Sequence, residues 1–278
     1  MTKIFNWLSA HKIVNVAISV VYYLLIVIPH EQVGRAIVNL FKTKSRAYYQ
    51  HTVLLIGVVA LCAILLFLAQ KIKNHPYRTR VLIALSATIA MMIVSFNLLL
   101  VHNVEIIHFV QYASFGFVIY PLFRNANKTL FWCTLAGAID EANQYLILAP
   151  QNTDYYDFND VILNQLGAGM GLVILFALGF YNVQRTKTKW YLSAEIITSV
   201  AIVISLIVMY VAGEFSYYMP TQGDAPLFVL IKKVYPNFFT EIKHLNVRFH
   251  VVKPYAGLVI VALIGVFYSF VLRKPKKE

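Results

Sequence analysis

Residues 51–72 read HTVLLIGVVALCAILLFLAQKI, a run whose side chains are almost all apolar. A helix rises about 1.5 Å per residue, so about 20 apolar residues cross the hydrocarbon core of a bilayer. Of the 278 residues, 59% are hydrophobic and only 13% are charged. The sequence therefore predicts an all-α fold, a polytopic transmembrane helix bundle of about eight spans. The other expected spans are 12–29, 80–101, 103–123, 129–149, 161–181, 193–212 and 255–272.

Lysine and arginine are unevenly distributed between the predicted spans. If the N-terminus lies inside, 15 of the 24 Lys and Arg residues fall in inside segments, and the short outside connections have none. Positive charge in short loops marks the cytoplasmic side. We therefore expect a multi-pass protein of the cytoplasmic (inner) membrane with both termini in the cytoplasm. The net charge of +12 then reflects topology signals and contacts with anionic lipid, and we expect no nucleic-acid partner.

Two segments between the spans are amphipathic. Residues 31–47, EQVGRAIVNLFKTKSRA, place apolar side chains at helical spacing with basic ones elsewhere. Residues 226–245, PLFVLIKKVYPNFFTEIKHL, are similar, although Pro236 interrupts them. We expect interfacial helices in these two outer loops. Either they form a rim that guides a lipid toward the interior, or they lie on the bilayer only because they are apolar.

The span predicted at 103–123 begins with polar side chains. Glu105 and His108 are three residues apart and share one face of a helix. Gln111 or Tyr112 continues that face, and spacing alone leaves both open. Ionisable groups in membrane spans are costly, so they are rare and usually functional. A packed, hydrogen-bonded core histidine is the structural alternative for His108.

The next span, 129–149, carries Glu141 and Gln144 on one face, with Asp140 beside Glu141. Glu141 lies in mid-span, where a charged side chain costs several kcal/mol unless it is paired or hydrated. Asp140 has a structural alternative, in which it pairs with a cation or points to a water-filled cleft. This span therefore predicts a second polar group inside the membrane.

A third polar group follows where the chain re-enters the membrane. Asp157, Asp160 and Asn164 have the spacing i, i+3, i+7, and Asp157 or Asn159 also suits a helix N-cap. Gly167 and Gly171 form a GxxxG pattern that permits close helix packing. Consecutive helices with short connections usually lie side by side. We therefore expect the three polar groups to meet near the outer membrane face.

Three chemical uses fit these groups. Carboxylates beside an imidazole act as general acid or base, and we assign catalytic roles to Glu141, Asp160 and His108. The same carboxylates, Glu141 and Asp160 together with Asp157, also suit a divalent cation such as Mg²⁺ or Ca²⁺, so the cofactor stays open. Binding of a polar head group without chemistry is the third use. The expected substrate-binding residues are Glu105, Gln111, Gln144, Asp157 and Asn164.

Three motifs in this order resemble the VanZ-like family of bacterial membrane proteins, over about residues 83–182. They are EIIHF (105–109), IDEANQ (139–144) and DFNDVILNQLGAGMG (157–171). The family often has an arginine before the last motif, whereas this chain reads APQNTDYYD, which weakens any role for a cation in that loop. The resemblance implies a VanZ-like four-helix core at 81–182. The flanks would be a two-span segment with an interfacial helix (1–80) and a two-span extension with a long extracytoplasmic loop (183–278).

The family name comes from an association with low-level resistance to the glycopeptide teicoplanin, so the resemblance implies a role in the cell envelope. The leading hypothesis is a protein that binds, or binds and processes, a membrane lipid or amphiphilic envelope precursor at the polar site. A proton- or ion-coupled lipid transporter or flippase is the alternative, although no inverted repeat is evident. A non-catalytic envelope assembly protein is the second alternative. Enzymatic activity and oligomeric state stay open.

Overall fold

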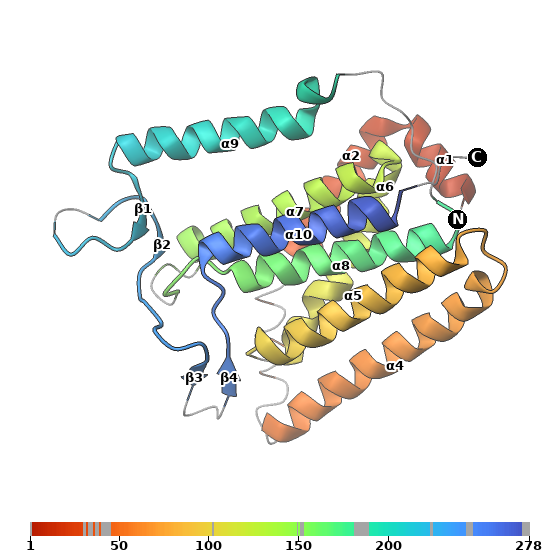
Figure 1. Ribbon diagram of the computed structural model, residues 1–278, viewed down its shortest axis with the longest axis horizontal. Coiled ribbons are helices and arrows are strands. Elements are labelled where there is room, and N and C mark those ends of the chain that lie inside the picture. Colours follow the sequence, from red (N-terminus) through yellow and green to blue (C-terminus); the bar gives the residue numbers. More distant parts are fainter. Residues whose placement is uncertain are drawn as a thin grey trace.

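Long apolar runs form most helices of the computed structural model (Figure 1). It describes residues 2–29, 46–101, 103–148, 150, 153–180, 189–222, 225–242 and 247–273, with isolated positions between 30 and 45. It is 74% helical, which confirms the prediction of a mainly α-helical fold. The helices are α1 (Thr2–Ala10), α2 (Lys12–Tyr22), α4 (Arg46–Ile72), α5 (Arg78–Leu98), α6 (Ile107–Phe123), α7 (Ala126–Asn143), α8 (Phe158–Ala177), α9 (Ala194–Val211) and α10 (Pro254–Val271). Single π-helical turns, η1 (Tyr23–Val27) and η3 (Gln144–Leu148), continue α2 and α7.

Each of the eight expected ranges holds a helix, but not every helix is long and apolar enough to cross a membrane. Within the described residues, Tyr48–Ile72 of α4 and the whole of α5, α8, α9 and α10 meet that test. α1 and α2 meet it only as a pair, which is bent by 106°. α6 has only 17 residues, and α7 carries Lys128, Asp140 and Glu141. The structure thus supports five spans, or six with the bent pair, and the expected eight are not confirmed.

Helix α8 lies in the middle of the bundle, with α5, α6, α7 and α10 around it (Figure 1). All of its residues are buried except Asp160 and Ile174. Because neighbours cover α8 on all sides, its apolar side chains are not confined to one stripe, and the polar Asn159, Asn164 and Gln165 are buried among them. Asp160 is the only polar side chain of α8 that is not buried. It is therefore the polar group of this helix that a ligand could reach.

Glycines let α8 approach α6 closely. A Cβ added to Gly167 would lie 2.8 Å from the Cα atom of Phe109. A Cβ added to Gly171 would lie 3.0 Å from the Cα atom of Ala113 and closer still to the Ala113 carbonyl oxygen. Both neighbours are backbone atoms, which cannot turn aside as a side chain can. The GxxxG pattern therefore permits direct contact between the α8 and α6 backbones.

Helix α10 covers another side of α8. The Tyr268 ring fills the space over Gly169, and its hydroxyl lies 2.9 Å from Oγ1 of Thr88 on α5. Gln165 of α8 donates from Nε2 to the Val261 carbonyl oxygen of α10 at 3.0 Å. These contacts join the C-terminal helix to the same central helix that carries the predicted site residues.

The segment between α9 and α10 contains short strands. β1 (Phe215–Tyr218) pairs in parallel with β2 (Phe228–Ile231), and β3 (Thr240–Ile242) pairs antiparallel with β4 (Val247–Phe249). The predicted interfacial helix at 226–245 is therefore wrong, since none of its described residues is helical. Pro236 disfavours a helix there, and pairing with β1 satisfies the backbone of β2 instead. The other predicted interfacial helix, at 31–47, lies almost entirely outside the described residues.

Helix α9 lies at one edge of the molecule (Figure 1) and none of its residues is buried. It joins the bundle through Glu195 in its first turn, whose Oε2 lies 3.2 Å from Nζ of Lys128 on α7. Trp132 of α7 donates from Nε1 to the other carboxylate oxygen at 3.3 Å. The remaining exposed side chains of α9 are mainly apolar, as expected for a helix surrounded by lipid.

Candidate functional site

Helices α6 and α8 bring three of the predicted side chains into contact. Nδ1 of His108, in the first turn of α6, lies 2.8 Å from Oδ1 of Asn164. Its Nε2 lies 3.5 Å from Oδ2 of Asp160, one helical turn away on α8. The His108 side chain is 3% exposed and that of Asp160 is 19% exposed. The imidazole is therefore enclosed, while the carboxyl group still reaches the surface of the bundle.

The contacts of the His108 ring indicate where a proton lies. Because the Asn164 oxygen can only accept a hydrogen bond, Nδ1 carries a proton in this arrangement. Nε2 then faces the Asp160 carboxyl group, and two deprotonated groups at that distance would repel each other. The pair therefore shares a proton, either as imidazolium and carboxylate or as imidazole and carboxylic acid. Such a pair can transfer a proton or hold a polar group.

Glu141, near the end of α7, belongs to the same polar region. Its side chain is buried, and its Oε1 accepts a hydrogen bond from Nε2 of Gln144 at 3.1 Å. Asp160, Asp157 and Asp140 are close enough to the buried Glu141 carboxyl group to interact with it electrostatically. The sequence prediction that α7 and α8 present their carboxylates to a common region agrees with this placement.

Asn164 connects all three helices. Its oxygen bonds to His108 of α6, and a Cβ added to Gly137 of α7 would lie 3.0 Å from the Asn164 Cβ. The Asn164 Nδ2 atom is buried and has no hydrogen-bond partner among the described residues. A buried donor left unsatisfied costs about 1–3 kcal/mol. This N–H group is thus available to a ligand or a water molecule at the site.

Asp157 precedes α8 and caps it. The side chain accepts a hydrogen bond from the Asn159 backbone N–H at 2.8 Å, as the N-cap alternative predicted. Burial, with a smaller contribution from the charge of Asp160, raises the pKa of Asp157 well above its usual range. Asp157 therefore caps α8 and also lies near the carboxyl group of Asp160.

Two other predicted substrate-binding residues make bonds within the protein. Oε2 of Glu105 accepts from the Val101 backbone N–H at 3.0 Å, which closes the turn before α6. Nε2 of Gln111 donates to the Ile26 carbonyl oxygen of η1 at 3.0 Å. Gln111 thus ties α6 to the N-terminal helix, and the structure gives it no bond to His108.

Tyr112 is the residue that the predicted site set omitted. It is fully buried, and its hydroxyl group has no hydrogen-bond partner within the described part of the chain. The charges of Asp140 and Glu141 act on this hydroxyl group. Spacing allowed Tyr112 as readily as Gln111, because both continue the face of His108. The structure favours Tyr112 as the member of the site.

The expected metal ligands are not arranged as a metal site. Where side chains are described, no group of three or more His, Cys, Asp or Glu is placed to hold an ion. Glu141, Asp157 and Asp160 are engaged by an amide, a backbone N–H and an imidazole, respectively. Each of these three carboxyl groups therefore has a partner within the protein.

Asn159 connects three segments of the chain beside the polar residues of α8. Its Nδ2 donates to the carbonyl oxygens of Leu99 at 3.2 Å and His250 at 2.7 Å, and its Oδ1 accepts from the Val252 N–H at 3.0 Å. One buried amide thus joins the start of α8, the end of α5 and the segment before α10.

We expect Asn159→Ala to lower the free energy of unfolding by about 2 kcal/mol, because three backbone groups, two of them in buried hydrogen bonds, lose their partner. Unfolding in mixed micelles, followed by tryptophan fluorescence, measures this change. Asn127→Ala is the matched control, since Asn127 is exposed at the start of α7 and should change stability by less than about 0.5 kcal/mol. Equal effects of the two variants would contradict the assigned role.

A family model described as VanZ/LLP1 matches residues 15–181. The match covers more than half of the chain and includes α6, α7 and α8, which carry the polar site. It begins well before residue 83, where the resemblance judged from the motifs began. No curated protein and no solved structure matched the chain.

Proposed function

The chain belongs to the VanZ/LLP1 family and is a membrane protein, and from this premise we propose that it binds the polar head of a lipid or amphiphilic cell-wall precursor inside its helix bundle. The observation that carries the proposal is the contact of His108 with both Asp160 and Asn164. An enclosed imidazole between an amide and a partly exposed carboxyl group is costly in a membrane unless it serves a ligand or a proton.

Each residue has a role that follows from its contacts. The His108–Asp160 pair supplies or accepts a proton. Glu141 accepts hydrogen bonds from the head group, with Gln144 holding its orientation. The unsatisfied Asn164 Nδ2 donates to a ligand oxygen. The apolar part of the same ligand remains in the lipid, which also surrounds the exposed apolar side chains of the outer helices.

The site faces the extracytoplasmic side in this proposal. His108 lies at the start of α6, Glu141 near the end of α7 and Asp160 at the start of α8, so all three lie at the same end of the bundle. The excess of basic residues in the segments at the opposite end favours a cytoplasmic location for that end. The protein then sits in the cytoplasmic membrane with both termini inside, and its ligand enters from the outer leaflet.

Glu141→Gln is expected to lower retention of the ligand about tenfold without loss of folded protein, since glutamine keeps the size of the side chain but not the proton chemistry of the carboxyl group. Wild type and variant are purified from the same membranes, and their bound lipids are compared by mass spectrometry. Loss of one hydrogen bond to the ligand predicts this tenfold difference in retained lipid. Glu241→Gln is the matched control, because Glu241 is exposed on β3, outside the site.

The same preparations separate the competing functions. Each preparation is incubated with an envelope-lipid extract. A new product that forms only with wild type shows that the protein catalyses a reaction as well as binding the lipid. Dependence on a proton gradient in proteoliposomes indicates transport. Teicoplanin tolerance of cells that express wild type but not Glu141→Gln links the site to glycopeptide resistance. Identical lipid content in wild type, variant and control contradicts the proposed function and favours the structural alternative.

A further inference from the structure

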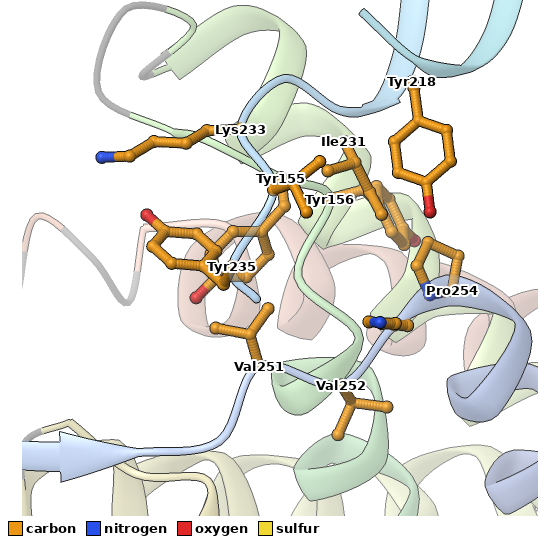
Figure 2. A pocket seen from close by; sticks show the side chains of 11 residues that line it. Tyr155, Tyr156, Tyr218, Ile231, Lys233, Tyr235, Val251, Val252 and Pro254 are labelled. Atoms are coloured by element: carbon orange, nitrogen blue, oxygen red, sulfur yellow. The ribbon is translucent and has the colours of Figure 1, made fainter. Parts of the chain in front are cut away.

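A cavity lies between the N-terminal helix α1 and the ends of α6 and α8, at the end of the bundle opposite to the strands (Figure 1). Its volume is about 130 Å³, and Asn6 of α1 and Arg124, which follows α6, are among its lining residues. The cavity between the strands and α10, which Tyr155 and Tyr235 help to line (Figure 2), has a volume of only about 20 Å³. Of the two, the cavity beside α1 therefore offers room for a group larger than a water molecule.

Helix α1 places this cavity at the depth of the lipid head groups. The chain bends by 106° between α1 and α2, so α1 does not continue α2 across the membrane. Ile4 and Trp7 of α1 are 62% and 51% exposed, whereas Phe5 is buried and its ring lies 4.8 Å from that of Phe180, which follows α8. A short helix with exposed apolar and Trp side chains is typical of the membrane interface. The cavity that it covers therefore lies beside the head groups.

Arg124 and Asn6 have more hydrogen-bond donors than the protein uses. Nε of Arg124 donates to Oγ of Ser9 at 2.9 Å, and its Nη2 donates to Oδ1 of Asn6. A guanidinium group carries five N–H groups, and the other three make no bond to a described residue. Because Oδ1 of Asn6 faces the guanidinium, its Nδ2 is also left as a donor beside the cavity. The cavity therefore offers several N–H groups to a ligand that accepts hydrogen bonds.

No carboxylate offsets the charge of Arg124. The described residues that line the cavity include no Asp or Glu, and Arg124 forms no ion pair with any described residue. Carbonyl groups at the ends of α6 and α8 have other donors. The Arg124 backbone N–H bonds to the Tyr120 carbonyl oxygen at 2.8 Å, and the Tyr120 hydroxyl donates to the Phe180 carbonyl oxygen at 2.5 Å. These carbonyl groups therefore do not need the guanidinium as a cap.

The backbone of Arg124 is unusual for a residue with a side chain. Its φ is 45°, and no other non-glycine residue in the described part of the chain has a positive φ. This left-handed conformation is strained for residues other than glycine, and glycine is common at such helix ends. Helix α8 follows that rule, since Gly179 after it has a φ of 89°. An arginine after α6 therefore costs stability, which a role for its side chain at the cavity accounts for.

We propose that this cavity binds the phosphate group of a membrane lipid through Arg124 and Asn6. The planar guanidinium group presents paired N–H donors that match phosphate oxygens. Basic pockets between membrane helices bind anionic lipid head groups, and this one opens at the depth of those groups. The bound phosphate would also join α1 to α6. Glu141 and His108 lie at the opposite end of the bundle, so this inference does not rest on the proposed function.

Calorimetric titration of the full-length protein in detergent tests this proposal. The probes are dihexanoyl phosphatidic acid below its micellar concentration, dihexanoylglycerol, which has the same chains without the phosphate, and inorganic phosphate. We expect wild type to bind phosphatidic acid about tenfold more tightly than dihexanoylglycerol. Arg124→Gln should bind phosphatidic acid about tenfold more weakly than wild type, as for one lost charge-assisted hydrogen bond.

Asn6→Asp separates phosphate binding from a structural link between α1 and α6. Aspartate keeps the oxygen that accepts from Arg124, so the link persists and the Tm should not fall below that of wild type. It also replaces the N–H donors of Asn6 by a second oxygen and brings a negative charge to the cavity. Because like charges repel, phosphatidic acid should bind more than about tenfold more weakly. Asn127→Asp is the matched control, since Asn127 is exposed at the start of α7 and outside the cavity lining, and its binding should stay within about twofold of wild type.

Equal binding of phosphatidic acid by wild type and Asn6→Asp would overturn the proposal and leave Arg124 as a link between two helices. Failure of wild type to bind phosphatidic acid, or equally tight binding of dihexanoylglycerol, would overturn it as well. Arg124-dependent binding of phosphatidic acid alone supports a lipid head group, and Arg124-dependent binding of inorganic phosphate too supports a site for the phosphate group itself. Glu141→Gln should bind phosphatidic acid at this cavity as wild type does, which separates this inference from the proposed function.

Discussion

Gly171→Ala is expected to lower the free energy of unfolding by more than about 3 kcal/mol, because the added methyl group meets backbone atoms of α6. Its Cβ would lie 3.0 Å from the Cα atom of Ala113, and closer to the carbonyl oxygen. Neither atom can move without displacing α6, so the two helices must separate. Since α6 carries His108 and α8 carries Asp160, the same displacement also disrupts the polar site. Thermal unfolding and size-exclusion profiles in detergent measure the loss of folded protein.

Gly116→Ala is the matched control at the same helix interface. A Cβ at Gly116 of α6 would lie 3.5 Å from the Ala168 carbonyl oxygen, which is an ordinary contact distance. Alanine is favoured over glycine in a helix by about 1 kcal/mol, so this variant should be neutral or slightly more stable. Unchanged stability of Gly171→Ala would show that α6 and α8 are farther apart at this position, and an equal loss in Gly116→Ala would show that the loss is not specific to the close contact at Gly171.

The helices and the first polar contacts could be predicted because both depend on local spacing. An apolar run of about twenty residues has few stable alternatives to a helix in lipid. Likewise, Asp160 and Asn164 are four residues apart, so any helix that contains them presents both to one neighbour. Short connections join α6 to α7 and α7 to α8, so the three helices are expected to pack together. The contacts of both residues with His108 therefore agree with the sequence analysis.

Long-range contacts decided the points at which spacing left a choice. Gln111 and Tyr112 both continue the face of His108, and the Ile26 carbonyl oxygen, far away in sequence, is what engages Gln111. The spacing suggested Asn159 only as a candidate helix cap, because the partners that its side chain bonds lie 60 or more residues away. In the segment 226–245, the helical spacing of the apolar side chains gave no sign of the strand β2, which forms by pairing with β1 earlier in the chain.

The His108–Asp160 contact should be the second large contributor to stability. We expect His108→Leu to lower the free energy of unfolding by about 2–3 kcal/mol, because it removes the buried imidazole and leaves the partly exposed Asp160 carboxyl group without that partner. The Asn164 side-chain oxygen also loses its hydrogen-bond donor, Nδ1 of His108, which adds to the cost. Unfolding in mixed micelles measures the change, and a loss below about 1 kcal/mol would contradict the pairing.

The double variant His108→Leu, Asp160→Leu separates the structural part of this effect from the functional part. Two apolar side chains replace a buried imidazole and its partly exposed carboxyl partner, so the double variant should be more stable than His108→Leu alone. Lipid retention should nevertheless stay absent, because the group that shares a proton with the ligand site is gone. A purely structural polar core predicts the opposite, namely that lipid content follows stability. If the double variant regains stability but still retains no lipid, His108 is buried for ligand binding rather than for stability.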